Sequence, residues 1–190
     1  MATWCLTDYT IEGEGKSVES LYKIIKEVDS TSYPTSADGF GSLWLKNIIS
    51  KMGGETSRIY CRGEIINYEM IDGLLYLQLE SAWSEMREWR YFVLRKYPNL
   101  KIYYRAEEED FGYYLTNDKD GIYYPERYRI SNSSDDDVYL NRPYDVFQYL
   151  MKKYQVKVSS IDEAYDKIEV FNNENKSANL KLVEFAIVDY

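Results

Sequence analysis

The 190-residue chain contains no histidine, and this absence excludes several kinds of chemistry. There is no imidazole general base, no serine or cysteine charge-relay triad, and none of the histidine ligands that most zinc sites use. Cysteine is also scarce, because only Cys5 and Cys61 occur and both fall in apparent strands. We therefore expect reduced structural thiols and no disulfide framework.

The chain also lacks a long apolar run and an excess of basic residues. No stretch approaches the length that spans a bilayer, and no basic segment precedes an apolar one at the N-terminus, so we expect a cytoplasmic protein with no membrane partner. Acidic residues outnumber basic ones by 32 to 23, and the net charge of -9 disfavours nucleic acid as a partner on electrostatic grounds. Tyrosine is abundant, with 21 residues, which is typical of recognition surfaces and of half-buried strand positions.

Apolar periodicity predicts an α+β fold for the first 130 residues. The expected order is strand, helix, helix, strand, strand, helix, strand and two short strands, over 3–12, 17–28, 45–52, 58–70, 74–82, 84–97, 100–108, 111–117 and 122–130. This order is that of the split β-α-β fold called ferredoxin-like, an antiparallel sheet with helices on one side. We predict a ferredoxin-like domain with extra strands over residues 1–130, and a polar loop over 29–42.

Several positions within these elements have specific expected roles. The dipeptide Asp72-Gly73 is a strong hairpin signal between two predicted strands. Ser84 is the expected N-cap of the third helix, and Glu85 suits the positive end of its dipole. The expected buried positions of the neighbouring strands and of this helix are Cys5, Thr7, Tyr9, Ile11, Leu75, Leu77, Leu79, Met86, Trp89, Phe92 and Val93.

Two tryptophans in the stretch LQLESAWSEMREW raise the question of a site. Trp89 lies on the apolar stripe of the third helix, so we expect a core residue whose truncation to alanine costs about 3 to 5 kcal/mol. Trp83 lies at the strand-to-helix corner, and we expect it to pack over the end of the sheet and to set the direction of the helix.

Residues 138–190 predict a C-terminal extension of two helices and a strand. Pro143 can open the first helix, and Ser160 with Glu163 forms a capping box for the second. The helix after Pro143 is expected to bear Phe147, Leu150, Met151 and Tyr154, and the final strand to share Val183, Phe185 and Ile187 on one face. We expect this extension to pack on the first domain, with a small separate unit as the alternative.

Three segments resemble a known family: TWC followed by IEG near the start, ESAWSEM at the strand-to-helix corner, and YPNLKIYYRAEEEDFGYYLTNDKDGIYYPERY. They are similar to the YubB ferredoxin-like domain family, whose members are carried by plasmids, prophages and conjugative elements. The resemblance covers about residues 1–130, and it implies a ferredoxin-like fold and a mobile-element setting. The family has no established activity, so the resemblance implies no catalytic residue.

The segment TIEGEGKS (residues 10–17) resembles a phosphate-binding loop between a strand and a helix. The last strand also ends in Asp189, in the manner of a magnesium-holding carboxylate. Thr10, however, stands where such a loop needs its first glycine, and the strands alternate as in an antiparallel sheet. We therefore interpret the segment as a tight turn.

The acidic runs at 107–110 and 135–137 are candidate divalent-metal sites, because hard cations bind several carboxylates. The segment NDKDG at 117–121 also matches part of a calcium loop, but the closing glutamate falls on Arg127. Turns and solvated surface fit these segments better, and we expect no metal and no other cofactor.

The open face of the predicted sheet is the remaining candidate site. If the leucines of the hairpin strand pack on the helices, the opposite face gathers the candidate binding residues Trp4, Leu6, Tyr76, Gln78, Tyr103 and Arg105. Aromatic residues on such a sheet stack RNA bases in some ferredoxin-like domains. Asp8, Glu80 and Glu107 share this face, however, and repel phosphate.

Three functions are compatible with these patterns. The leading hypothesis is a non-enzymatic protein-binding or regulatory protein of a mobile element, in one version an acidic imitation of nucleic acid that occupies a host defence protein. The second is an enzyme that acts on a small or sugar-like ligand through carboxylates beside Tyr103 or Tyr113. The third is single-stranded nucleic-acid binding through the open face. We expect a protein partner and assign no catalytic residue.

Overall fold

The computed structural model describes residues 3–31 and 40–189, so most of the loop predicted over 29–42 lies outside the described residues. The chain is a mixed α+β protein that divides into two compact units, Met1–Asn117 and Asp118–Tyr190. Residues 118–130, which we expected in the first domain, belong to the second unit. Within the described ranges no helix is long and apolar enough to cross a membrane.

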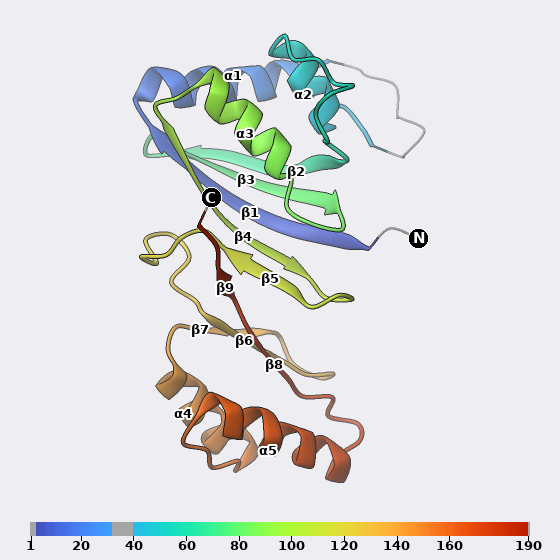
Figure 1. Cartoon of the computed structure of the whole chain (residues 1–190), viewed down its shortest axis with the longest axis vertical. Helices are drawn as coiled ribbons and strands as arrows, with labels where there is room; N and C mark the ends of the chain where they lie inside the picture. The colour runs from blue at the N-terminus through green and yellow to red at the C-terminus, as the bar shows by residue number, and fades with distance from the viewer. Residues whose placement is uncertain (1–2, 32–39, 190) are drawn as a thin grey trace. The chain divides into compact units, whose positions relative to one another are not determined.

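The first unit is an antiparallel sheet with its helices on one side (Figure 1). The strands are β1 (Trp4–Gly13), β2 (Gly63–Ile71), β3 (Leu74–Ala82), β4 (Leu100–Glu108) and β5 (Tyr113–Thr116). They lie in the order β2-β3-β1-β4-β5, and each neighbouring pair is antiparallel. The helices are α1 (Gly15–Asp29), α2 (Leu45–Lys51) and α3 (Arg87–Lys96).

Strand alternation in this sheet follows the sequence prediction. All the expected inward positions of β1 and β3, from Cys5 to Ile11 and from Leu75 to Leu79, are buried. The β2–β3 turn also has the predicted form, because Asp72 and Gly73 have φ of 51° and 82°, the left-handed values that a two-residue type I′ hairpin needs. Alternation and turn chemistry thus determine which side of the sheet faces the helices.

The start of α3 differs from the prediction. The helix begins at Arg87 with Met86 as its N-cap, so the expectation that Ser84 caps it is wrong. Glu85 is not a solvated helix-start carboxylate, because its side chain lies in the interior and pairs there with Arg90. Interior pairing of Glu85 therefore competes with, and overrides, the local capping signal. Trp89 is fully buried, as predicted.

Trp83 is also placed differently from the prediction. Its side chain is 44% exposed, so it does not pack over the end of the sheet. Its φ of 67° is unusual for a large side chain, because the left-handed region brings Cβ close to the backbone. The corner is held by the backbone, since the Trp83 amide donates to the Thr3 carbonyl oxygen at 3.0 Å.

The second unit combines a small antiparallel sheet with two helices. Its elements are β6 (Tyr128–Ser131), β7 (Val138–Leu140), α4 (Pro143–Tyr154), α5 (Ile161–Glu174), β8 (Lys181–Glu184) and β9 (Ala186–Ile187), with the order β7-β6-β8 in the sheet. The core consists of buried residues from both layers: Tyr128, Ile130, Val146, Leu150, Ala164, Ile168, Leu180 and Leu182.

Pro143 begins α4 and Ser160 caps α5, as predicted, with the Ser160 hydroxyl accepting from the Glu163 amide at 3.1 Å. Of the residues that the sequence places on α4, Leu150 is buried and Met151 is exposed. The final strand is divided at Phe185, whose amide donates to the Arg127 carbonyl oxygen at 2.9 Å. Consequently Leu182 and Phe185 are buried, whereas Ile187, which we expected to share a face with Phe185, is exposed.

Candidate functional site

The six candidate residues lie together on the face of the first unit's sheet that is opposite the helices. Strand register shows this, because Asp8 lies opposite both Gln78 and Arg105, and Thr10 lies opposite both Tyr76 and Tyr103. Trp4 and Leu6 point to the same side along β1, which is the side away from the buried Cys5 and Tyr9. We call this surface of β1–β5 the open face.

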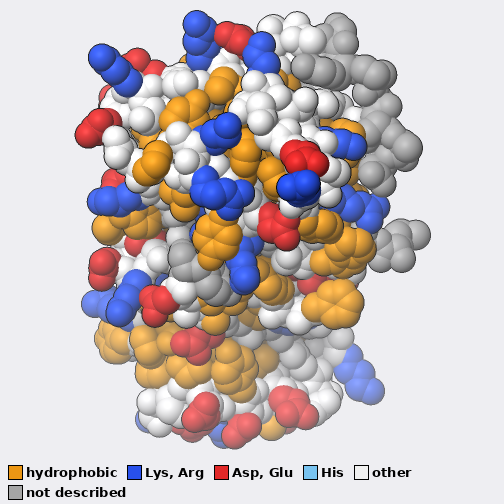
Figure 2. Space-filling view, turned by 45° about the horizontal axis from the view of Figure 1, so that its top comes forward, with side chains coloured by type: hydrophobic (Ala, Val, Ile, Leu, Met, Phe, Trp, Pro, Cys, Tyr) orange, Lys and Arg blue, Asp and Glu red, His pale blue; other side chains and the backbone are white. Residues whose placement is uncertain are grey.

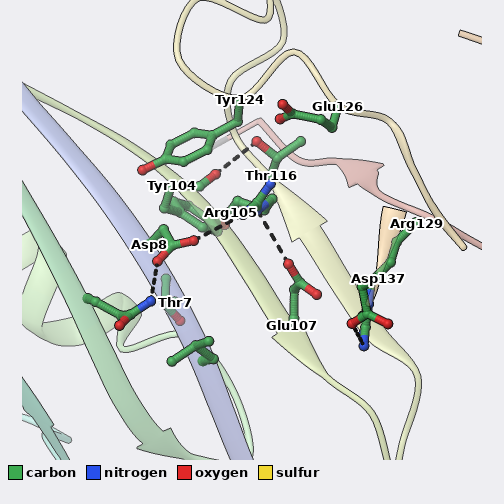
Figure 3. Close-up of polar contacts among 12 residues, drawn as sticks. Thr7, Asp8, Tyr104, Arg105, Glu107, Thr116, Tyr124, Glu126, Arg129 and Asp137 are labelled. Carbon is green, nitrogen blue, oxygen red and sulfur yellow. Dashed lines mark hydrogen bonds and ion pairs between the residues drawn. The ribbon is translucent and has the colours of Figure 1, made fainter. Parts of the chain in front are cut away.

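A line of polar contacts crosses the open face from β3 to β4. The Gln78 amide donates to Asp8 Oδ1 at 3.0 Å, and Arg105 donates to Asp8 Oδ2 at 3.1 Å. Arg105 also forms an ion pair with Glu107, with 3.3 Å between Nε and Oε1 (Figure 3). The one arginine among the candidate residues is therefore engaged by two carboxylates of its own sheet.

Carboxylates outnumber cations on the open face. Register places there the acidic residues Asp8, Glu12, Glu64, Glu69, Glu80 and Glu107 and the basic residues Lys101 and Arg105. Glu64 lies directly opposite Glu80, although like charges at opposed positions destabilise an antiparallel pair. Over the helices α1–α3, by contrast, basic and acidic side chains are mixed (Figure 2).

Two of these carboxylates are without a partner among the described residues. Glu69 and Glu80 are both exposed and form no hydrogen bond or ion pair with a described side chain. The two cations of the face are already engaged, since Lys101 binds Glu12 at 3.1 Å and this contact raises the Lys101 pKa. The face therefore presents unneutralised negative charge at β2 and β3.

Aromatic side chains gather at the end of the open face where β1 begins. Trp4, which is 44% exposed, meets the Phe40 ring edge-on with 5.9 Å between ring centroids. Phe40 in turn stacks on Trp44 at 5.7 Å. The exposed Trp83 follows Ala82, the residue opposite Trp4, and the Arg62 guanidinium lies 5.2 Å from the Trp83 ring centroid. Phe40, Trp44 and Trp83 were not among the predicted site residues.

The remaining candidate segments are accounted for by turns. At TIEGEGKS, both sheet neighbours of β1 are antiparallel to it, whereas a phosphate-binding loop follows a strand of a parallel sheet. Glu14 is the N-cap of α1, and its carboxylate accepts from the Asn99 side-chain amide at 3.4 Å. A Cβ on Gly13 would lie 2.7 Å from the Asn99 carbonyl oxygen, so this glycine serves a close approach of two backbones. The geometry favours the tight turn.

The acidic segments are likewise engaged within the protein. Asp118 accepts from the amides of Ile122, Tyr123 and Tyr124 at 2.6 to 3.0 Å. Burial alone would raise the Asp118 pKa, but these hydrogen bonds and the nearby Arg127 lower it below its usual value. Arg127 donates to the Asp118 carbonyl oxygen at 2.7 Å, so the residue that replaces a calcium-loop glutamate closes the turn itself.

Carboxylates of the other acidic runs are also engaged by groups of the protein itself. Glu108 accepts from the amides of Asp110 and Phe111, and Asp135 pairs with Lys153 at 2.8 Å. In the part of the chain that the structure describes, no group of three or more histidine, cysteine, aspartate or glutamate residues is arranged to hold a metal ion.

A buried polar cluster connects α3 to the sheet of the first unit. Arg90 Nε donates to Glu85 Oε1 at 2.9 Å, and the Tyr9 hydroxyl donates to the same oxygen at 2.8 Å. The Arg90 guanidinium also lies 5.0 Å from the Tyr104 ring centroid. Burial lowers the Arg90 pKa, but the hydrogen bond and the charge of Glu85 outweigh it, so that the net shift is upward. The side chains of Arg90 and Glu85 are only 1% and 2% exposed, so no substrate reaches them in this structure.

The enzyme hypothesis requires two carboxylates that converge in a pocket. One hollow of about 400 Å³ lies along α1 and another of about 340 Å³ lies beside α5, and each is lined by one carboxylate, Glu27 and Glu174 respectively. Tyr103 contacts Glu12 at 3.4 Å on the open face and lines neither hollow. These hollows therefore give the enzyme hypothesis no support.

No protein-family model matches this chain, and no curated protein or solved structure matches it either.

Proposed function

We propose that this protein is a non-enzymatic binding protein whose open face recognises a cationic segment of a partner protein. The observation that carries the proposal is the excess of carboxylates on that face, above all the exposed Glu69 and Glu80 without partners among the described residues. Glu64 and Glu80 occupy opposed positions, where like charges destabilise an antiparallel pair, and in the described part of the chain the Glu64 side chain is engaged only by the Gly41 amide at 2.9 Å. A bound cation would relieve this repulsion.

The aromatic side chains supply the second half of such a site. Trp4 and Leu6 are 44% and 40% exposed, and Tyr76 and Tyr103 flank Thr10 on the two neighbouring strands. Aromatic rings beside unneutralised carboxylates suit the alkyl stems and charged heads of lysine and arginine. The same carboxylates repel phosphate, so nucleic acid fits the face less well than a basic protein segment.

We further propose that the first unit is a ferredoxin-like domain of the YubB kind, carried by a mobile element. In support, the four strands β2-β3-β1-β4 are antiparallel, with helices between β1 and β2 and between β3 and β4. In that setting, a basic nucleic-acid-binding surface of a host defence protein is the kind of partner that the open face would occupy.

The proposal is tested with lysine-rich and arginine-rich peptides and the full-length protein. The variant Glu69→Gln/Glu80→Gln removes two charges from the open face, and Glu19→Gln/Glu55→Gln removes two exposed charges elsewhere in the same unit. An exposed ion pair contributes up to about 1 kcal/mol, so the loss of two such pairs should weaken peptide binding by the Glu69→Gln/Glu80→Gln variant about tenfold. The affinity of the Glu19→Gln/Glu55→Gln control for the same peptides should stay within about twofold of the parent.

Fluorescence anisotropy at low and at raised salt measures these affinities. Binding should weaken as salt rises, because exposed charges are screened. Equal losses in the two variants, or tighter binding of a single-stranded oligonucleotide than of the peptides, would overturn the proposal.

A further inference from the structure

Strand β2 is the outermost strand of the first unit's sheet, and β3 is its only neighbour in the strand order. The beginning of β2 is covered, because Trp44 forms a bridge with Glu64 and the Ile65 amide donates to the Leu43 carbonyl oxygen at 3.1 Å. Beyond Ile65, no described residue pairs with the outer edge of β2.

The hairpin turn determines which backbone groups of β2 point outward. In a two-residue hairpin the residues that flank the turn, here Ile71 and Leu74, form the hydrogen-bonded pair, and the next pair along does not. The amides and carbonyls of Met70 and Tyr68 therefore point away from β3. Among the described residues, none forms a hydrogen bond with these outward groups.

The side chains of β2 do little to protect this edge. Natural sheets shield their edges with charged side chains, especially lysine, and with proline, short strands or bulges. The strand GEIINYEMI contains neither lysine nor proline, and Glu69 is the one charged residue of its unpaired part. The strand has one irregularity, between Ile65 and Asn67, and it exposes Ile66 and Ile71, which are 49% and 44% exposed. Residues Asn67–Ile71 thus form an ordered, unblocked template for another strand.

Contacts of Tyr68 with α1 hold the middle of this template. The Tyr68 hydroxyl donates to Asp29 at the end of α1 at 2.7 Å, and its ring meets the Tyr22 ring edge-on at 5.9 Å. Because the strand is fixed before a partner arrives, the partner does not have to order it, and less binding free energy is lost.

The charges on β2 indicate what kind of strand would fit. Side chains on an added strand alternate between the two faces of the sheet, so every second one would lie on the open face beside Glu69. A second copy of β2 would place its own glutamates there and be repelled, whereas lysine or arginine would be attracted. The intervening side chains would lie beside Tyr68 and Met70, which favours apolar residues.

We infer that the partner adds to the outer edge of β2 as an extended segment in which cationic and apolar residues alternate. The inference rests on the proposed function and specifies how the cationic segment is bound: backbone hydrogen bonds to Tyr68 and Met70 give affinity, and Glu69 selects the cationic side chains.

A peptide of about seven residues, with lysine at every second position and threonine or valine between, is the probe for the full-length protein. Two N-methylated forms of this peptide test whether it adds to the edge as a strand. In an added strand only every second peptide amide faces β2, so each form is methylated on one of the two alternate sets of amides. We expect methylation of the set that faces β2 to weaken binding at least about tenfold, and methylation of the other set to change it by less than about twofold. A peptide of the same composition with its lysines clustered should bind more weakly.

On the protein, Met70→Pro removes an outward amide without removing a bond to β3, and Met70→Ala is the matched control that keeps the amide. We expect the proline variant to lose peptide binding about tenfold and the alanine variant to lose less than about threefold, with circular dichroism confirming that both are folded. If the proline variant does not fold, the two methylated peptides decide the question with the unmodified protein.

The possible failures are distinguishable. If the alternating peptide binds, but both methylated forms bind equally well, the edge inference is wrong and the proposed open-face function stands. If no cationic peptide binds at low salt, both are wrong. Dimerisation of the protein through β2, detected as a mass increase that Met70→Pro abolishes, would replace the cationic segment with a second copy and overturn the inference.

Discussion

Replacing Arg90 with methionine should destabilise the protein more than almost any surface change. In the structure Arg90 and Glu85 are 1% and 2% exposed and lie 2.9 Å apart, and Tyr9 donates to the same carboxylate. Removal of one partner of a buried ion pair leaves an uncompensated charge in the core, which costs about 3 to 5 kcal/mol. Arg90→Met keeps most of the side-chain volume, so a loss of this size reports on the charge and not on a cavity.

A double-mutant cycle separates the pair from its surroundings. The variants are Arg90→Met, Glu85→Gln and the double substitution, each unfolded with urea and followed by far-UV circular dichroism. We expect the double variant to be more stable than Arg90→Met alone, with a coupling free energy of about 2 kcal/mol or more, because neither charge then remains unpaired. The midpoint should shift while the urea dependence stays the same, since the fold is retained.

Two results would refute this reasoning. One is a loss of less than about 1 kcal/mol in Arg90→Met, which is the value for a solvated surface pair. The other is strict additivity in the cycle, which would mean that Glu85 and Arg90 do not interact in solution.

Two further predictions concern single side chains. Burial, the largest contribution, raises the pKa of the Cys5 thiol to about 11, so the folded state resists its ionisation. The stability that comes from this shift is complete below the unfolded pKa near 9.0 and is lost as pH rises to about 11, because the unfolded thiol ionises first. Between these pH values Cys5→Ala should therefore lose less free energy of unfolding than the parent, by on the order of 2 kcal/mol in urea titrations. An equal dependence of the free energy of unfolding on pH in the two proteins would refute this. Asp118→Ala should lower the free energy of unfolding by about 1 to 3 kcal/mol, because three amide donors lose their acceptor. Asp118→Asn keeps one acceptor oxygen and should lower it by less. Equal melting temperatures for the two variants would argue against this explanation.

Local sequence signals predicted much of the first unit. β4 occupies Leu100–Glu108, the predicted range, and α1 begins two residues before the predicted 17–28. These elements depend on apolar residues at period 2 or 3.6 and on turn residues a few positions away, all of which can be read within a short window. The same reasoning failed at Ser84 because Glu85 is drawn inward by Arg90 and Tyr9, and the tyrosine is 76 residues away from that glutamate along the chain.

In the candidate site, too, some features follow from local sequence and others from long-range contacts. Counting outward from the Asp72-Gly73 turn places Glu69 opposite Tyr76, so the sequence alone determines that cross-strand pair. Counting on without interruption would place Glu64 opposite Ser81, but the irregularity between Ile65 and Asn67 moves it to Glu80. Opposed glutamates on the open face therefore arise from a one-residue shift that no local pattern announces.

The sequence by itself predicted the order of the strands and helices from β1 to β5, the apolar side of β1 and β3, the absence of imidazole chemistry and the acidic balance of the chain. It did not predict β7, and it placed a strand over 122–130 where the structure has β6 only from Tyr128. Only the tertiary structure decided that β2 is an edge strand, that Glu69 and Glu80 stay exposed beside it, that Trp83 is exposed and that Arg90 is buried. The physical reason is range. Periodicity and turn chemistry act over a few residues, whereas strand order, register shifts and the burial of a charge depend on contacts between segments far apart in the chain.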